Sequence, residues 1–159
     1  MRKWIRKSML LASILATSAA LTQAEEKEVP LNEVPEAVLK SVKGKFPKAE
    51  LKKAEKEVED GETTFELSLT SEGKKMDVAL KEDGSIIEVE TQIKASDLPE
   101  AVTKTLMAKY PKATIKKAEE IAKDKKTSYE VVLVDGKEKH EVLVDATGKI
   151  VKDEEEDDD

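Results

Sequence analysis

Residues 98–119 read LPEAVTKTLMAKYPKATIKKAE, and this stretch decides how the rest of the chain is organised. Much of it also occurs 64 positions earlier, where residues 34–38 read VPEAV and residues 51–55 read LKKAE. About 21 residues are identical when the two parts of the chain are aligned at this offset. Two copies are too few for an extended repeat array, so the sequence predicts two small tandem units.

Each copy opens with a predicted helix. Pro35 and Pro99 suit the first helical position, where the missing backbone N–H is not needed, and Pro47 and Pro111 end the helix. Apolar residues recur at every fourth position and form one stripe along each helix: Val34, Val38, Val42 and Phe46, then Leu98, Val102, Leu106 and Tyr110. Beyond each helix the apolar period falls to two, which indicates strands.

The segment at residues 50–58, and its copy at residues 114–122, carries two conflicting signals. Leu51, Ala54 and Val58 have the spacing of a helical stripe, whereas the Asp60-Gly61 turn that follows is typical of a hairpin. The spacing alone leaves helix and strand open. We predict strands, because a hairpin turn requires a partner strand ahead of it.

These elements predict an α+β fold of two tandem units, each with one helix packed on a four-stranded antiparallel sheet. We place the units at residues 29–92 and 93–152. Residues 153–159 are all acidic and offer no apolar side chain to bury, so we expect a disordered tail whose removal changes stability little.

Residues 1–24 have the features of a cleaved export signal. Arg2, Lys3, Arg6 and Lys7 precede a short apolar run, and cleavage is expected after Ala24 or Ala20. The run is shorter than the roughly 20 residues of a membrane-spanning helix, and the absence of cysteine excludes a lipid anchor on a cysteine. We therefore expect a bacterial periplasmic or secreted protein with no stable membrane anchor after cleavage.

The charge of the chain restricts its partners. The formal net charge is −7, and losing the four cations of the predicted signal leaves 24 Lys and Arg against 35 acids, a net charge of −11. A polyanion such as nucleic acid is repelled by this charge, so we expect no nucleic-acid partner.

The sequence offers no constellation of catalytic, metal-ligating or cofactor-binding residues. His140 is the only histidine and there is no cysteine to join it, so a packed histidine is the expected role. Acidic pairs lie in turns and on polar strand positions, and none has the spacing of a calcium loop. We predict a protein that is not an enzyme and that has no catalytic residue, no metal ligand and no cofactor.

One group of apolar residues does not fit the repeat. Val132, Val134 and Leu143 are expected on the sheet face that points away from the helix, where the first copy has Ser68, Thr70 and Ala79. A shared fold does not require this difference, and clustered exposed apolar side chains usually mark a contact. These three residues are our candidate interface.

The combined pattern resembles the PepSY-like family, which is also described as beta-lactamase-inhibitor-like. The segments that carry the resemblance are Leu-Pro-Glu-Ala-Val, Tyr-Pro-Lys-Ala, Ile-Lys-Lys-Ala-Glu and the closing Asp-Ala-Thr-Gly-Lys-Ile. It covers nearly all of the chain after residue 24, in two tandem copies. The resemblance implies a small exported bacterial protein with a helix-on-sheet fold, and a protein-binding or inhibitory role.

Two functional hypotheses follow. The first is an exported non-enzymatic binding module that docks or inhibits another envelope or secreted protein. The second is an acidic periplasmic protein that binds a cation or a small ligand.

The exported protein is expected to begin at or near Glu25 and to contain no tryptophan, because Trp4 is the only one in the chain. Intact mass and tryptophan emission of the exported protein test this. Retention of Trp4 would instead indicate an uncleaved anchor.

Overall fold

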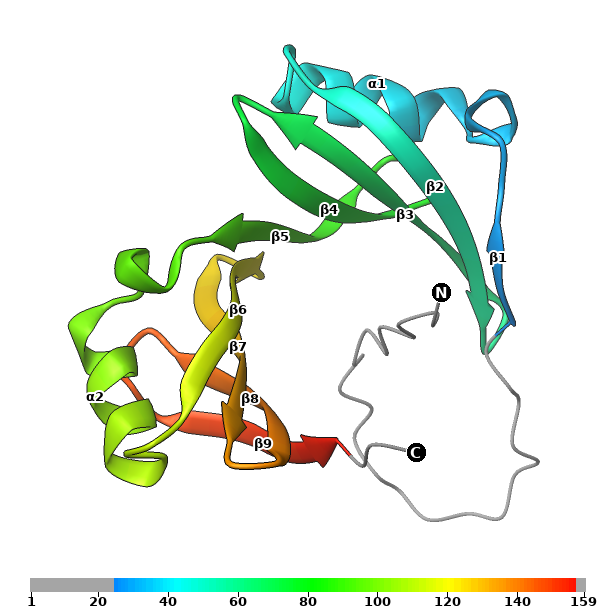
Figure 1. The fold of residues 1–159 in the computed structure, drawn as a ribbon. Coiled ribbons are helices and arrows are strands. Elements are labelled where there is room, and N and C mark those ends of the chain that lie inside the picture. Colours follow the sequence, from blue (N-terminus) through cyan, green and yellow to red (C-terminus); the bar gives the residue numbers. More distant parts are fainter. Residues whose placement is uncertain (1–24, 157–159) are drawn as a thin grey trace.

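The computed structural model of the protein describes residues 25–156, which form one antiparallel sheet and two α-helices. The predicted signal at residues 1–24 lies outside the described residues. Within the described part, the sheet has nine strands in the order in which they occur along the chain, β1 to β9. Figure 1 shows both helices on the outer side of the curved sheet.

Each half of the molecule contains one α-helix followed by four strands, and the first half begins with one additional strand. The first half of the molecule (residues 25–93) contains β1 Glu25–Glu28, α1 Glu36–Lys45, β2 Glu50–Glu59, β3 Glu62–Ser71, β4 Lys74–Lys81 and β5 Ile86–Ile93. The second half (residues 94–156) contains α2 Glu100–Lys109, β6 Thr114–Lys123, β7 Lys126–Asp135, β8 Glu138–Asp145 and β9 Ile150–Glu156. A short 3-10 helix precedes each α-helix, at Leu31–Glu33 and Ala95–Asp97.

The sheet is continuous, which corrects the prediction of two separate four-stranded sheets. The last strand of the first half, β5, pairs with the first strand of the second half, β6, from Glu88 opposite Lys123 to Ile93 opposite Ala118. The segment before the first helix forms the additional strand β1 against β2, which the predicted units do not contain. Both differences have the same cause, because an open sheet edge presents unpaired N–H and C=O groups that a neighbouring segment can satisfy.

The two helices begin and end where the prolines predict. Pro35 and Pro99 stand immediately before α1 and α2, and Phe46 and Tyr110 cap the other ends through bonds to backbone oxygens one turn earlier. The predicted stripes face the sheet, since Val38, Val42, Val102 and Leu106 are fully buried.

Two hydrophobic clusters lie between the sheet and its helices. One joins α1 to β2–β5 and the other joins α2 to β6–β8. Strand β5 contributes Val89 to the first cluster and Ile93 to the edge of the second. Because side chains four residues apart in a strand share a face, both helices cover the same face of the one sheet. The opposite face, which we call the helix-free face, carries no helix within residues 25–156 (Figure 1).

The ambiguous segments at residues 50–58 and 114–122 are strands, as predicted, and a bulge explains their helical spacing. Leu51 pairs with Leu69 while Lys53 pairs with Ser68, so Lys52 is an extra residue in the ladder. Lys116 is extra in the same way in β6. An extra residue shifts the strand's alternation by one, so apolar side chains three residues apart reach the same face.

The tail prediction is wrong for four of its seven residues. Asp153 to Glu156 belong to β9, which pairs with β8 from Ile150 opposite Val144 to Glu156 opposite Lys139. Pairing satisfies the backbone of this acidic segment, and the Asp153 side chain reaches the end of α2 (below). The remaining residues of the expected disordered tail, 157–159, lie outside the described part.

The two outer strands of the sheet, β1 and β9, are both rich in acid, with sequences EEKE and IVKDEEE. Neither α1 nor α2, the helices of the described region, has the length and apolar character needed to cross a membrane.

Glycine is required where a turn passes under a helix. Gly84 has a φ of +86°, and a Cβ built there would lie 2.6 Å from the Ala37 carbonyl oxygen of α1. We expect Gly84→Ala to lower the free energy of unfolding by about 1–3 kcal/mol, measured by urea denaturation. Gly44→Ala, inside α1 with open space around it, is the control and is expected to stabilise the protein by about 0.5–1 kcal/mol. Equal effects of the two substitutions would contradict this account.

Candidate functional site

The helix-free face is the inner side of the curved sheet (Figure 1). Strand register decides which side chains reach it. Val131, Leu133, Val142 and Val144 belong to the cluster under α2, so the residues between them in β7 and β8 point to the opposite face. The register predicted for the second copy is therefore correct.

The candidate interface residues lie on this face, and none of them belongs to the cluster under α2. Val132 is 4% exposed, and its cross-strand neighbours are Lys117 and Glu141. Val134 and Leu143 are half-buried. The aliphatic stems of the flanking charged side chains can cover a central valine in this way, while its two companions stay accessible.

Ile121 joins these three residues, and sequence reasoning missed it. It lies in β6 opposite Ser128 and Glu90, is 8% exposed, and belongs to neither core cluster. Glu57 is its counterpart in the first copy. Aligning the two copies at an offset of 64 pairs Ile121 with Glu57. The sequence did not fix which side chains of residues 114–122 share a face, so this difference was not recognised. We call Ile121, Val132, Val134 and Leu143 the apolar patch.

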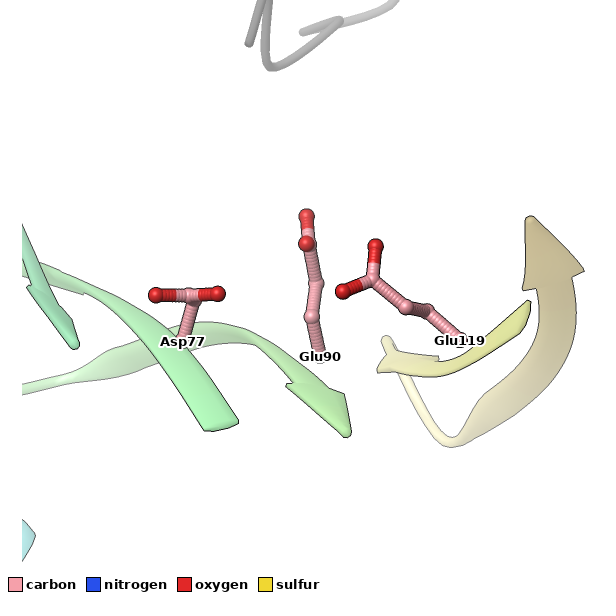
Figure 2. A group of neighbouring side chains, drawn as sticks. All are labelled: Asp77, Glu90 and Glu119. Atoms are coloured by element: carbon pink, nitrogen blue, oxygen red, sulfur yellow. The ribbon is translucent and has the colours of Figure 1, made fainter. Parts of the chain in front are cut away.

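Three carboxylates meet on the helix-free face at the junction of the two halves. Asp77 in β4, Glu90 in β5 and Glu119 in β6 each place an oxygen within 4.8 Å of the others (Figure 2). Glu90 stands between the other two, as the cross-strand partner of Asp77 and diagonal to Glu119. Oxygen ligands in such a group suit a hard divalent cation or a cationic side chain.

The surroundings of the three carboxylates hold them in place. Ser68 donates a hydrogen bond of 2.5 Å to Asp77, and Lys117 donates one of 2.6 Å to Glu119, which is only 3% exposed. Sequence analysis did not find this group, because its members come together only through the pairing of β5 with β6. No pattern within either copy predicts that pairing.

A second polar group lies on the helix side, at the end of α2. The Tyr110 hydroxyl donates to Asp153 at 2.8 Å and lies 3.4 Å from Nδ1 of His140, and Lys109 also donates to Asp153. His140 is 8% exposed and stacks at 4.6 Å from the Tyr110 ring, so the prediction of a packed histidine is confirmed. The equivalent positions of the first half carry the apolar residues Phe46, Met76 and Val89.

The group at the end of α2 ties β9 to the helix by electrostatics. Burial by itself raises the pKa of Asp153, but the hydrogen bonds from Lys109 and Tyr110 outweigh it and hold that pKa below its usual value. The ionised carboxylate is therefore the form that the folded protein favours. This explains why an acidic segment stays in the sheet.

Comparison with protein families gives a match over most of the chain. The PepSY-like family, described as beta-lactamase-inhibitor-like, matches residues 20–88 and again residues 69–152. The two overlapping regions agree with the two copies seen in the sequence. A comparison with curated proteins gave no match.

Solved structures share the fold at low sequence identity. A DUF2874 family protein from Bacteroides uniformis superposes with a TM-score of 0.66 at 16% identity, over 76% of this chain and 88% of that one. A BLIP-like protein from Bacteroides fragilis gives 0.63 at 18% identity, over 79% and 91%. A protein from Bacteroides eggerthii, described as a candidate periplasmic protein, gives 0.65 at 13% identity, over 77% and 88%.

Asp153→Asn tests the contact between β9 and α2. We expect it to lower the free energy of unfolding at neutral pH by about 1–3 kcal/mol, because a charge-assisted hydrogen bond is lost. A carboxyl with a lowered folded pKa stabilises the protein fully above its unfolded pKa of about 3.9, and this contribution is lost as the pH falls through the folded pKa. The difference between wild type and variant should therefore shrink below about pH 4.

Glu154→Gln is the matched control for Asp153→Asn, since Glu154 is the next residue of β9 and its side chain is 53% exposed. It should change stability by no more than about 0.5 kcal/mol. An Asp153→Asn protein as stable as wild type at pH 7 would show that the Tyr110–Asp153 contact does not hold β9. In that case the loss of residues 153–159 would be tolerated, as the sequence alone predicts.

Proposed function

Because this chain belongs to the PepSY-like family, we propose that it is an exported, non-enzymatic binding module. It docks another envelope or secreted protein with the helix-free face of its sheet. The observation that carries this proposal is the apolar patch, which the second half has and the first half lacks. In the first half the equivalent residues are Glu57, Ser68, Thr70 and Ala79.

The fold does not account for the apolar patch. Each half is one copy of the repeat and contains one helix and four strands of the repeat. The core on the helix side is apolar in both halves. The helix-free face of the first half has small or polar residues at the same positions, so large apolar residues are not needed there for folding. Val134 and Leu143 are half-buried, so covering them in a complex contributes a part of the roughly 1.5–3 kcal/mol that full burial of an aliphatic side chain gives.

The same face suits an inhibitory role. A module that covers a functional surface of its partner blocks that surface without any chemistry of its own. The description of the family as beta-lactamase-inhibitor-like, and of the Bacteroides fragilis structure as BLIP-like, supports this form of the proposal. Inhibition would then depend on the apolar patch in the same way as binding.

We place the protein in the bacterial periplasm. The predicted export signal at residues 1–24 supports this location, and the similar structure from Bacteroides eggerthii is described as a candidate periplasmic protein. The absence of cysteine means that folding there needs no disulfide formation.

A second candidate function is cation binding, favoured by one specific observation. Asp77, Glu90 and Glu119 place their oxygens within reach of a single ion, and two of the three side chains come from the first half and one from the second. A cation held there would join the two halves at their junction. It would not use the apolar patch, and this difference separates the two candidates.

The binding proposal is tested by replacing accessible patch residues with those of the first half. Val134→Thr with Leu143→Ala reproduces Thr70 and Ala79 and leaves the buried Val132 in place. Immobilised wild-type protein is expected to retain a partner from the envelope fraction, and the double variant should bind it about tenfold or more weakly. Quantitative mass spectrometry of the eluates measures the difference.

Val58→Thr with Leu31→Ala is the matched control, because these are exposed aliphatic residues away from the patch, 37% and 36% exposed. It should retain the partner as wild type does. If no retained protein distinguishes the patch variant from this control, the helix-free face is not a docking site. Saturable calcium binding that Glu90→Gln abolishes would then support the second candidate.

A further inference from the structure

The helix-free face is divided into two chemically different parts. Its second half carries the apolar patch among lysines and acids in similar number. Its first half carries mostly acids, with few lysines among them. The acids are Glu26, Glu28, Glu50, Glu55, Glu57, Glu59, Glu62, Glu66, Asp77, Glu88 and Glu90, and the lysines are Lys53, Lys75 and Lys81.

Register places several of these acids directly opposite one another. Glu26 pairs with Glu57, Glu28 with Glu55, and Glu55 in turn with Glu66. Like charges opposite each other in an antiparallel pair destabilise the sheet. Consistent with this crowding, burial and then the neighbouring Glu59 and Glu26 raise the pKa of Glu57. Lys53 forms ion pairs with Glu28 and Glu55 and offsets part of this repulsion, and a cationic partner would relieve more of it.

We propose that the partner is a basic protein segment in which lysine or arginine side chains accompany aliphatic ones. The basic side chains lie over the acidic part, across β1 to β5, and the aliphatic ones lie on the accessible residues of the apolar patch, Val134 and Leu143. This inference rests on the proposed docking function and adds the chemistry and the orientation of the partner. The two parts of the face adjoin where Glu90 pairs with Ile121, so one continuous segment can contact both.

Other occupants fit the face less well. A second copy of this chain carries the same negative charge, −7 overall, and is repelled by the acidic part. A divalent cation satisfies carboxylates but leaves the apolar patch unused. A basic segment with aliphatic residues is complementary to both parts of the face, and electrostatic complementarity of this kind speeds association and excludes wrong partners.

The test uses two labelled synthetic peptides of equal length, one alternating leucine with lysine and one alternating leucine with glutamate. Fluorescence anisotropy measures their binding to the full exported chain at about 0.15 M salt. Wild type is expected to bind the leucine–lysine peptide at least about tenfold more tightly than the leucine–glutamate peptide. Raising the salt concentration should weaken this preference, because exposed charges are screened.

Two double variants on the helix-free face separate the two contributions, and a third on the helices is the control. Glu57→Gln with Glu66→Gln should weaken binding of the leucine–lysine peptide about three- to tenfold and reduce the salt dependence of this binding. Glu36→Gln with Glu100→Gln makes the same charge change on exposed helical residues, and it should leave the affinity within about twofold of wild type. Val134→Thr with Leu143→Ala should weaken binding at low and high salt alike.

The outcomes distinguish this inference from the proposed function. Tighter binding of the leucine–glutamate peptide that still depends on Val134 and Leu143 would overturn the basic partner and leave the docking face standing. Equal weakening by the helical and the sheet glutamine variants would also overturn it, because the attraction would then be only the net charge. Peptide binding that none of the sheet variants changes would overturn the docking face itself.

Discussion

The antiparallel pairing of β5 with β6 is the contact on which the rest of the molecule depends. It joins the two copies of the repeat in one nine-stranded sheet and places both helices on one side. It therefore leaves a single uninterrupted face free of helices. It also brings Asp77 and Glu90 from one copy next to Glu119 from the other. Without this pairing, each copy would have an open sheet edge and a face only half as large.

The two faces of the sheet have diverged to different extents between the copies. On the helix side most apolar positions are kept, and the largest difference is the group Phe46, Met76 and Val89, which corresponds to Tyr110, His140 and Asp153 in the second copy. That change replaces packing by hydrogen bonds and keeps the last strand in place. On the helix-free face, Ile121, Val132, Val134 and Leu143 stand where the first copy has Glu57, Ser68, Thr70 and Ala79. The core is thus more alike in the two copies than the helix-free face is.

Features of the fold that depend on residues close together in the sequence were predicted correctly. The prolines set the limits of both helices, and the Asp60-Gly61 turn identified the hairpin even though a bulge at Lys52 gave the preceding strand a helical spacing. Alternation in β7 and β8 placed the candidate interface on the correct face. The pairing of β5 with β6, the strand β1 and the acidic end of β9 at residues 153–156 were missed, because each depends on backbone groups of a distant segment and leaves no periodic signal. The three clustered carboxylates were missed for the same reason.

The acid-rich outer strands β1 and β9 have a consequence for assembly. Two copies joined edge to edge within one chain show that this sheet can be extended, and the same geometry repeated between chains would extend it without limit. Each outer strand instead presents negative charge, EEKE at one edge and DEEE at the end of the other. Two molecules that approach edge to edge therefore repel each other. Charge along both outer strands of the described region therefore opposes further growth of the sheet by edge-to-edge pairing between molecules.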